Sequence, residues 1–258
     1  MIVLKTPSEL AIMRQAGRIV AEILETFGRV VKPGITLIEL DKIAEDIIAS
    51  RDGVSSFKNY LPDGAREHGA PPFPGTICSS VNEEIVHGIP TSRKLKEGDI
   101  VKLDVGASYN GYHADSAITL PVGKVSRQAT ELMRVTQLCL EESIKVARAG
   151  NRFGDIGAAI QRVAEGAGFS VVQEYSSHGV GRKLHEGFSL LNTGTAAMGM
   201  LLRPGLTVAI EPMINVGTYL TKVKNDLWTV STKDGKLSAH FEHTVAVTDG
   251  DPEVLTRF

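Results

Sequence analysis

The stretch KEGDIVKLD at residues 96–104 is followed 107 positions later (211 − 104 = 107) by a similar stretch, RPGLTVAIE at residues 203–211. Both copies begin with a basic residue, carry a glycine and a valine in matching places, and end on an acid. The two acids are Asp104 and Glu211. Recurrence of this kind indicates an internal repeat, and the apolar residues that precede each acid predict a β-strand.

Each of these strands is expected to pair with another strand that also carries an acid. Residues 98–105 and 112–122 read as strands joined by a turn at Asn110-Gly111, a dipeptide typical of hairpins. The second strand contains DSAITL at 115–120, which resembles EHTVAV at 242–247 and likewise starts on an acid. We also expect strands over 207–214, 227–232 and 240–247, and a Pro- and Gly-rich loop over 59–76.

Two helices are expected before each strand pair. Thr6-Pro7-Ser8-Glu9 and Thr36-Leu37-Ile38-Glu39 have the pattern of a capping box, which starts a helix. Helical spacing of apolar residues returns over 130–147 and 151–167. The helix pairs align at an offset of 116 (150 − 34 = 116), which matches Gly34, Leu40 and Ala44 with Gly150, Ile156 and Ile160. The sequence thus predicts an α+β fold of two pseudo-symmetric halves, roughly 1–123 and 124–258, each made of helix, helix and β-hairpin within a single domain.

The composition excludes several classes of protein. The 258 residues include 28 Lys and Arg against 30 Asp and Glu, so no basic excess predicts binding to nucleic acid or to a membrane surface. The two cysteines, Cys78 and Cys139, are too few for a disulfide framework or a structural zinc finger. No apolar run reaches the ~18 residues of a membrane helix, and the N-terminus lacks a signal-peptide pattern. A cytoplasmic protein is therefore expected.

The four acids of the repeat are candidate metal ligands. Asp104, Asp115, Glu211 and Glu242 fall two to a half in equivalent places. If the halves pack about a pseudo-twofold axis, the four carboxylates converge, and without a cation they would repel or stay protonated. Two divalent ions would balance their charge. The alternative for Asp104 is a solvated outer face, because Ile100 and Lys102 share its side of an alternating strand.

Three histidines add to this set. His178 and His185 bracket the stretch HGVGRKLH, and His87 opens the stretch HGIP. A lone histidine in a Gly-rich loop is usually a surface residue, but the second histidine and the acids downstream favour a site. Oxygen-rich ligation with one imidazole suits Mn(II), Fe(II) or Co(II), and Zn(II) is also accepted. Two neighbouring metals favour metal-assisted hydrolysis, without indicating which bond is hydrolysed.

The order and spacing of these residues resemble type I methionine aminopeptidase. The resemblance covers nearly the whole chain and is carried by His87-Gly88-Ile89-Pro90, Asp104, Asp115, His178-Gly179-Val180-Gly181, His185-Glu186, Ile210-Glu211-Pro212 and Phe241-Glu242-His243-Thr244. It implies the pita-bread fold, in which two pseudo-symmetric halves place helices over a curved antiparallel sheet. It also implies removal of the initiator methionine from nascent polypeptides whose second residue is small, by attack of a water or hydroxide that bridges two metals on the scissile carbonyl.

The resemblance also assigns roles to the candidate residues. Asp104 would hold the second metal, and Asp115 and Glu242 would bridge both. His178 and Glu211 would complete the first, with Glu211 also accepting the proton of the attacking water. His87 would contact the nitrogen side of the scissile amide, and His185 the carbonyl oxygen. The methionine side chain would be held by a pocket of Phe73, Cys78, Leu184, Met213 and Trp228, for which ordinary core packing is the alternative.

Some sequence features indicate which subtype of the family the chain resembles, and at other positions the chain differs from the residues that are usual in the family. The spacing of 33 positions from His178 to Glu211 (211 − 178 = 33) leaves no room for the helical insertion of the type II enzymes. Gly187-Phe188 stands where the family usually has an acid or small residue followed by proline. Residues 61–72 look longer and more Pro-rich than in compact bacterial enzymes. Leu184 replaces a frequent aromatic residue, and His240 replaces a frequent polar amide.

Two other functions remain open at this point. One is a related aminopeptidase that acts before proline, and the other is a binding protein that kept the fold and lost catalysis. All five ligand positions and both histidines are present, which favours the enzyme. The expected partners are the N-termini of nascent polypeptides, while contact with the ribosome stays open. We expect a monomer that needs neither nucleic acid nor membrane.

Overall fold

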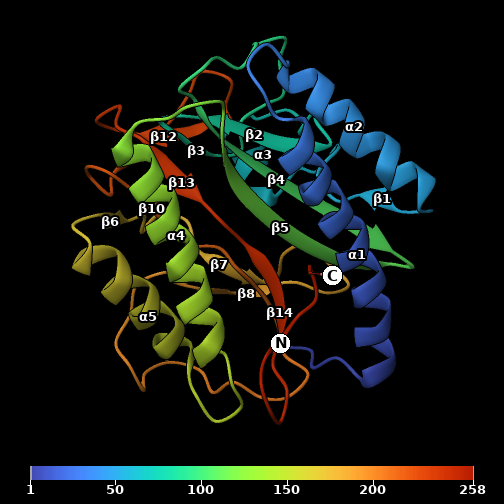
Figure 1. The fold of residues 1–258 in the computed structure, drawn as a ribbon. Coiled ribbons are helices and arrows are strands. Elements are labelled where there is room, and N and C mark those ends of the chain that lie inside the picture. The colour runs from blue at the N-terminus through green and yellow to red at the C-terminus, as the bar shows by residue number, and fades with distance from the viewer. Residues whose placement is uncertain (1, 258) are drawn as a thin grey trace.

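The computed structural model describes residues 2–257, and its helices and strands follow the predicted order (Figure 1). The helices are α1 (Pro7–Val30), α2 (Leu37–Ser50), α3 (Asp63–Glu67), α4 (Arg127–Val146) and α5 (Phe153–Gly166). The strands are β1 (Val54–Ser55), β2 (Ile77–Val81), β3 (Glu84–Val86), β4 (Ile100–Tyr109), β5 (Tyr112–Pro121), β6 (Ser170–Val171), β7 (Ser177–Gly179), β8 (Glu186–Leu190), β9 (Thr207–Ile210), β10 (Met213–Asn215), β11 (Thr221–Val223), β12 (Val230–Thr232), β13 (Ser238–His240), β14 (His243–Ala246) and β15 (Glu253–Val254).

The two predicted capping boxes start α1 and α2. The hydroxyl of Thr6 accepts from the amide of Glu9, whose carboxylate accepts from the Thr6 amide, and Thr36 and Glu39 make the same pair of bonds. The reciprocal bonds satisfy amides that a helix leaves unpaired at its first turn. Local sequence was therefore sufficient to fix where these helices begin.

The first predicted hairpin is a long, regular ladder. Strands β4 and β5 pair antiparallel from Ile100↔Pro121 to Tyr109↔Tyr112 around the turn at Asn110-Gly111. The side of β4 that carries Val101, Leu103 and Val105 packs with α1 and α2 into one hydrophobic core. The other side is covered too, because the Lys102 ammonium is 1% exposed and donates to the carbonyls of Asn82 and Ser238. The solvated outer face considered for Asp104 is therefore wrong.

The second strand pair is not a hairpin. Strands β9 and β14 pair antiparallel from His243↔Ile210 to Ala246↔Thr207, but residues 211–242 run between them. The strand expected over 207–214 ends at Ile210, because Pro212 has no amide to donate to the ladder. It resumes as β10 in a different sheet with β13, and the strand expected over 240–247 is likewise divided into β13 and β14.

Other elements were not predicted from the sequence. The expected loop over 59–76 contains the short helix α3. The strands β2, β3, β7 and β8 were also missed, because they are short and are defined by pairing with distant segments. These pairings complete four antiparallel sheets, ordered β1-β4-β2 with β5 beside β4, β13-β10-β6, β11-β12-β3, and β15-β14-β9-β7-β8.

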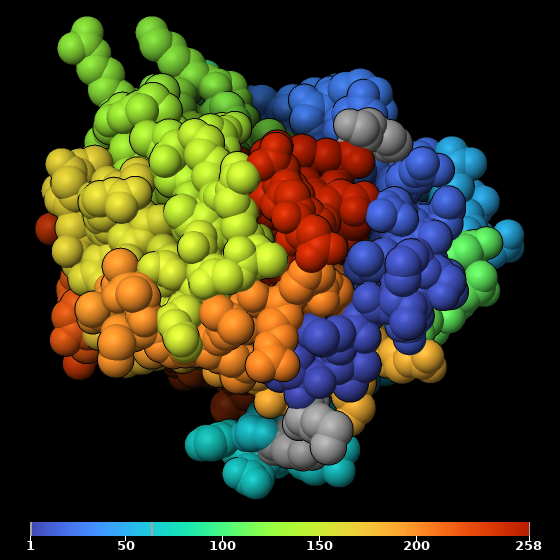
Figure 2. Space-filling view, turned by 90° about the horizontal axis from the view of Figure 1, so that it is seen from below, coloured from blue at the N-terminus to red at the C-terminus, as the bar shows by residue number. Residues whose placement is uncertain are grey.

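The halves are joined along their acid-bearing strands. Ala117 of β5 and Glu242, which precedes β14, donate their amides to each other's carbonyls, at 3.3 and 2.9 Å. Helices α1 and α2 lie on one side of the strands β5, β13 and β14 in Figure 1, and α4 and α5 on the other. The C-terminal segment lies between the two helix pairs (Figure 2), where a Cβ on Gly17 of α1 would lie 1.9 Å from the Leu255 carbonyl oxygen. No helix among residues 2–257 is both long and apolar enough to cross a membrane.

Candidate metal centre

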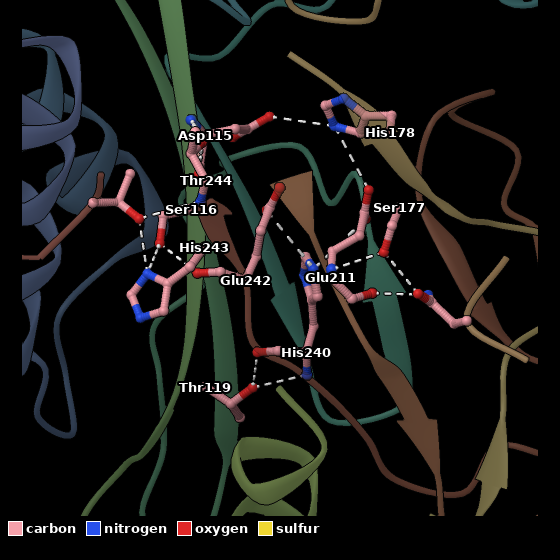
Figure 3. A network of polar contacts seen from close by, with 12 residues as sticks. Asp115, Ser116, Thr119, Ser177, His178, Glu211, His240, Glu242, His243 and Thr244 are labelled. Carbon is pink, nitrogen blue, oxygen red and sulfur yellow. Dashed lines mark hydrogen bonds and ion pairs between the residues drawn. The ribbon is translucent and has the colours of Figure 1, made fainter. Parts of the chain in front are cut away.

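The four candidate acids lie where the strand pairs of the two halves meet. Asp104 pairs with Ala117 in the β4–β5 ladder and Asp115 pairs with Gly106, so the two aspartates lie on one face, and their carboxyl groups contact each other. The Ala117–Glu242 pairing places Glu242 next to them, and Glu211 follows the end of β9. Figure 3 shows Asp115, Glu211 and Glu242 around one space, with His178 and His240 at opposite ends.

His178 faces this space in a form that suits a metal. Its Nδ1 contacts the carbonyl oxygen of Gly179 at 3.0 Å, and this contact is a hydrogen bond when Nδ1 carries the proton. Nε2 then keeps its lone pair, and it lies 3.8 Å from Asp115 Oδ2 and 3.6 Å from Glu211 Oε1. Burial lowers the pKa of His178 to about 4, so the ring is neutral at physiological pH. A neutral imidazole with one nitrogen anchored is the usual metal-binding state of histidine.

The buried carboxyl groups of the candidate ligands lack the positively charged partner that a bound cation would supply. Oδ1 of Asp104, Oδ1 of Asp115 and Oε1 of Glu242 are buried and lack a hydrogen-bond partner among the described residues. Burial raises the pKa of Asp115 to about 7, and burial together with the neighbouring acids raises the pKa of Asp104, Glu211 and Glu242. Unpaired buried carboxyl oxygens are costly. Ligand atoms of Asp115, His178 and Glu242 lie within 4.8 Å of one another, so the donor set fits divalent metal.

Glu211 is held in place through its backbone. Its amide donates to Ser177 Oγ at 3.0 Å, the Ser177 hydroxyl donates to Asn192 Oδ1 at 2.7 Å, and Asn192 Nδ2 donates to the Glu211 carbonyl at 2.9 Å. This closed set of bonds replaces the ladder that ends at Ile210. It leaves the Glu211 side chain free to face the metal space (Figure 3).

His240, one of the departures from the family, lies against the same carboxylates. The residue is 1% exposed, and Nε2 lies 3.7 Å from Glu211 Oε2 and 3.9 Å from Glu242 Oε2. Its backbone is fixed by two bonds with the hydroxyl of Thr119. Burial lowers the pKa of His240 to about 3, so this ring is neutral as well.

His87 and His185 both line the adjoining cavity. His87 follows β3 with a left-handed backbone at φ 59°, and a Cβ on the next residue, Gly88, would lie 2.2 Å from the Ser79 carbonyl oxygen. The His87 ring contacts Tyr175 edge-on at 5.7 Å between centroids. The ring of His185 is tilted against that of His178, with 4.2 Å between centroids and 59° between planes, and its Nδ1 lies 2.6 Å from the hydroxyl of Tyr60. Desolvation lowers the pKa of both His87 and His185, so both rings are neutral.

The cavity has a volume of about 530 Å³ and two chemically different ends. One end is formed by the metal-site residues, and the other is apolar and includes four of the five predicted pocket residues, Phe73, Cys78, Leu184 and Trp228. Met213 does not line it. This residue is fully buried in a separate cluster with Ile85, Val86, Val172 and Val230, where its side chain on β10 supports the cavity wall from behind.

The two loop departures shape the cavity mouth. Phe188 packs against Phe153, and a Cβ on Gly179 would meet its ring at 2.4 Å, so the bulky side chain turns back onto the core. The long loop over 61–72 covers the apolar end, where the carbonyl of Pro71 accepts from the Trp228 indole at 2.9 Å. Three further aromatic residues, Phe57, Tyr60 and Tyr175, also line the cavity and were not predicted from the sequence. The clustering of Phe57 and Tyr60 at the entry to a Pro-rich loop was the available signal.

Comparisons with known proteins agree with this geometry. Residues 11–249 match the model of metallopeptidase family M24. The chain is 49% identical over 257 residues to methionine aminopeptidase 1 of Bacillus subtilis, which covers 100% of both chains. The crystal structure of methionine aminopeptidase from Thermotoga maritima is 42% identical, covers 100% of both chains and superposes with a TM-score of 0.94. Prolidase from Pyrococcus furiosus, at 18% identity and a TM-score of 0.78 over 99% of this chain and 66% of its own, shares the fold alone.

The fold is that of a pita-bread metallopeptidase, its buried cluster of Asp115, His178 and Glu242 fits a divalent metal, and the chain belongs to metallopeptidase family M24. Within that family the predicted resemblance to the type I methionine aminopeptidases is confirmed, and the activity is that of a methionyl aminopeptidase, a hydrolase that acts on the N-termini of polypeptide chains. The predicted fold class is confirmed as well.

Proposed function

We propose that this enzyme removes the initiator methionine from nascent polypeptides whose second residue is small, in the cytoplasm. The observation that carries the proposal is the cavity with one apolar end and one end of buried acids and histidines. The apolar end matches an unbranched methionine side chain in chemistry. It includes Cys78 and the aromatic rings of Phe73 and Trp228, with which a thioether makes favourable contacts.

Asp104, Asp115, His178, Glu211 and Glu242 would hold two divalent ions. When bound, two divalent ions would act as Lewis acids: they would lower the pKa of water so that it becomes a nucleophile at neutral pH, and they would polarise a carbonyl. Mn(II), Fe(II) and Co(II) suit this oxygen-rich set with a single imidazole, and Zn(II) is also accepted. The neutral state of His178 and its bond to Gly179 support its role as the imidazole ligand.

Glu211 is the proposed proton acceptor. Its carboxylate lies between His178 on one oxygen and His240 on the other, and its backbone is fixed through Ser177 and Asn192. Such a carboxylate takes the proton of the attacking water and returns it to the amine that leaves when the C–N bond breaks.

His87 and His185 are proposed to hold the peptide. Both rings are neutral, so each offers one N–H donor at physiological pH. His87 lies beside Trp228 at 6.4 Å between ring centroids, next to the methionine pocket, which suits contact with the nitrogen side of the scissile amide. His185 suits the carbonyl oxygen, where a donor stabilises the negative charge that develops during attack.

A peptide panel tests the proposal. After anaerobic reconstitution with each of Mn(II), Fe(II), Co(II) and Zn(II), we expect release of methionine from Met-Ala-Ser and Met-Gly-Ser and much slower release from Met-Leu-Ser. A chelator should abolish the activity. Ala-Pro-Ala serves as the control for the aminopeptidase that acts before proline. Cleavage of Ala-Pro-Ala in preference to Met-Ala-Ser would show that the proposed specificity is wrong.

A further inference from the structure

The two cavity histidines differ in what holds them. The ring of His87 packs edge-on against the aromatic rings of Tyr175 and Trp228. The ring of His185 instead has a short polar contact, 2.6 Å between its Nδ1 and the hydroxyl of Tyr60, with the ring centroids 5.3 Å apart. The two residues are 125 positions apart, so the tertiary structure brings them together.

Tyr60 is itself fixed before it reaches His185. Its amide donates to the Phe57 carbonyl at 2.9 Å, and its carbonyl accepts from the amide of Phe73 at 2.9 Å. The neighbouring residue Asn59 donates to the carbonyl of Phe73 at 2.8 Å. These bonds attach the start of the 61–72 loop to the floor of the methionine pocket. The phenol is therefore presented to His185 by a defined backbone.

The contact selects one tautomer of His185. A neutral imidazole carries one N–H donor and one acceptor nitrogen. A phenol is a far stronger acid than the N–H of a neutral imidazole, so the favourable direction is from the Tyr60 hydroxyl to Nδ1. Nδ1 is then the acceptor, and the proton of the ring is on Nε2, at the opposite end of the ring from Tyr60. An N–H at Nε2 is the donor that a carbonyl oxygen needs as it gains negative charge.

We propose that Tyr60 is a positioning residue for His185: its hydroxyl donates to Nδ1 and thereby fixes the ring orientation and the Nε2–H tautomer that faces the substrate carbonyl. The proposal rests on the assignment of His185 to the carbonyl oxygen. Without Tyr60, the ring can rotate and populate the Nδ1–H form, which presents a lone pair instead of a donor. The role parallels that of a residue that anchors one nitrogen of a catalytic histidine so that the other acts correctly.

The tautomer can be measured directly and independently of activity. The protein is labelled with ¹⁵N-histidine and loaded with diamagnetic Zn(II), and two-bond ¹H–¹⁵N correlations report which nitrogen of each ring carries the proton. In the wild type we expect His185 as Nε2–H. In Tyr60→Phe we expect a mixture of tautomers at His185 and unchanged signals from His178. Tyr175→Phe removes a hydroxyl from the other cavity tyrosine and is expected to leave the His185 tautomer as it is.

A kinetic cycle tests the consequence. With His185 present, Tyr60→Phe is expected to lower kcat on Met-Ala-Ser about tenfold with little change in KM, because the donor acts on the transition state. In a His185→Ala background the same Tyr60→Phe change is expected to have no further effect on kcat. Equal losses in both backgrounds would show that Tyr60 acts on the substrate itself and would overturn the proposal.

The two measurements separate the possible failures. An Nδ1–H tautomer in the wild type, or an unchanged tautomer in Tyr60→Phe, contradicts the positioning role whatever the substrate is. Absence of methionine release with a correct tautomer change instead contradicts the proposed function. Thermal unfolding of Tyr60→Phe, which keeps the ring, confirms that the comparison is made between folded proteins.

Discussion

The two acid-bearing strand pairs are built differently. Strands β4 and β5 are ten residues each and form one continuous ladder, with Asp104 and Asp115 inside it. Strands β9 and β14 are four residues each, and their acids lie just outside the ladder, Glu211 after β9 and Glu242 before β14. The regular pair carries two aspartates, and the interrupted pair carries two glutamates, whose side chains are longer.

The difference shows two ways to fix a metal ligand. Inside the ladder, backbone hydrogen bonds on both sides hold a short aspartate with little freedom. At the strand ends, side chains replace the ladder, as Ser177 and Asn192 do for Glu211. The interruption also has a use, because the inserted residues 211–242 bring Trp228 to the cavity and His240 to the carboxylates. The regular pair thus acts as scaffold for two of the candidate ligands, and the interrupted pair supplies the other two together with Trp228, which lines the cavity.

The largest expected effect is at the interrupted pair. Glu211→Gln keeps the size of the side chain but removes the proposed proton acceptor, and general base catalysis is typically worth about 10²–10⁴-fold in rate. We expect kcat for Met-Ala-Ser to fall by about that factor, measured by steady-state kinetics at saturating metal. Glu25→Gln, at an exposed ion pair of α1, is the matched control. Survival of activity in Glu211→Gln would show that the assignment is wrong.

The regular pair is tested by its metal content. Asp115→Ala removes a proposed metal ligand from inside the ladder, and we expect fewer than two metals per chain after reconstitution and gel filtration. Metal analysis by mass spectrometry gives the number, and activity should fall with it. The exposed Asp249→Ala is expected to keep two metals. Two tightly bound metals in Asp115→Ala would contradict this proposed role.

Stability should depend more on the scaffold than on the outer part of the insertion. Leu103 on β4 is fully buried between the ladder and α1, and Leu103→Ala is expected to cost about 2–5 kcal/mol of unfolding free energy. Val223 on β11 is 53% exposed, and Val223→Ala is expected to change the unfolding free energy by less than about 0.5 kcal/mol. Urea denaturation at constant metal concentration measures both. Similar losses for the two variants would remove the distinction between scaffold and insertion.

A last prediction concerns the pH dependence of metal affinity. The pKa of Asp115 is raised to about 7, and those of Asp104, Glu211 and Glu242 are also raised, so the metal-free protein holds protons that a metal must displace. Affinity should therefore rise with pH from 6 to 8, about tenfold per pH unit for each proton released. His178, with its pKa lowered to about 4, adds no proton in this range.

Calorimetric titration in two buffers with different ionisation enthalpies counts the released protons. A proton release of zero at pH 7 would show that the carboxylates are already ionised in the metal-free protein. Release from the Asp115→Ala variant should be smaller than from the wild type. This result would connect the raised pKa values to the cluster itself.

Most of the structure that could be predicted depends on interactions between residues close together in the sequence. The capping boxes at Thr6 and Thr36 start helices because the bonds involved span three residues, and the Asn110-Gly111 turn sets the first hairpin for the same reason. The repeat placed the four acids in equivalent positions, since each half repeats the same order of elements. The ligand and histidine roles were predicted from the resemblance and stay proposals.

Only the tertiary structure decided the rest. Pro212 and the pairing of β10 with β13 turned an expected hairpin into an interrupted pair, and Met213 packed behind the cavity instead of lining it. Lys102 is buried in the folded chain, which lowers its pKa to about 7, and its ammonium donates to the carbonyl of Ser238, 136 positions away. Tyr60 reached His185 across 125 positions. Contacts of this kind depend on which segments meet in space. The residue pattern of one strand or helix does not specify which distant segment will pack against it.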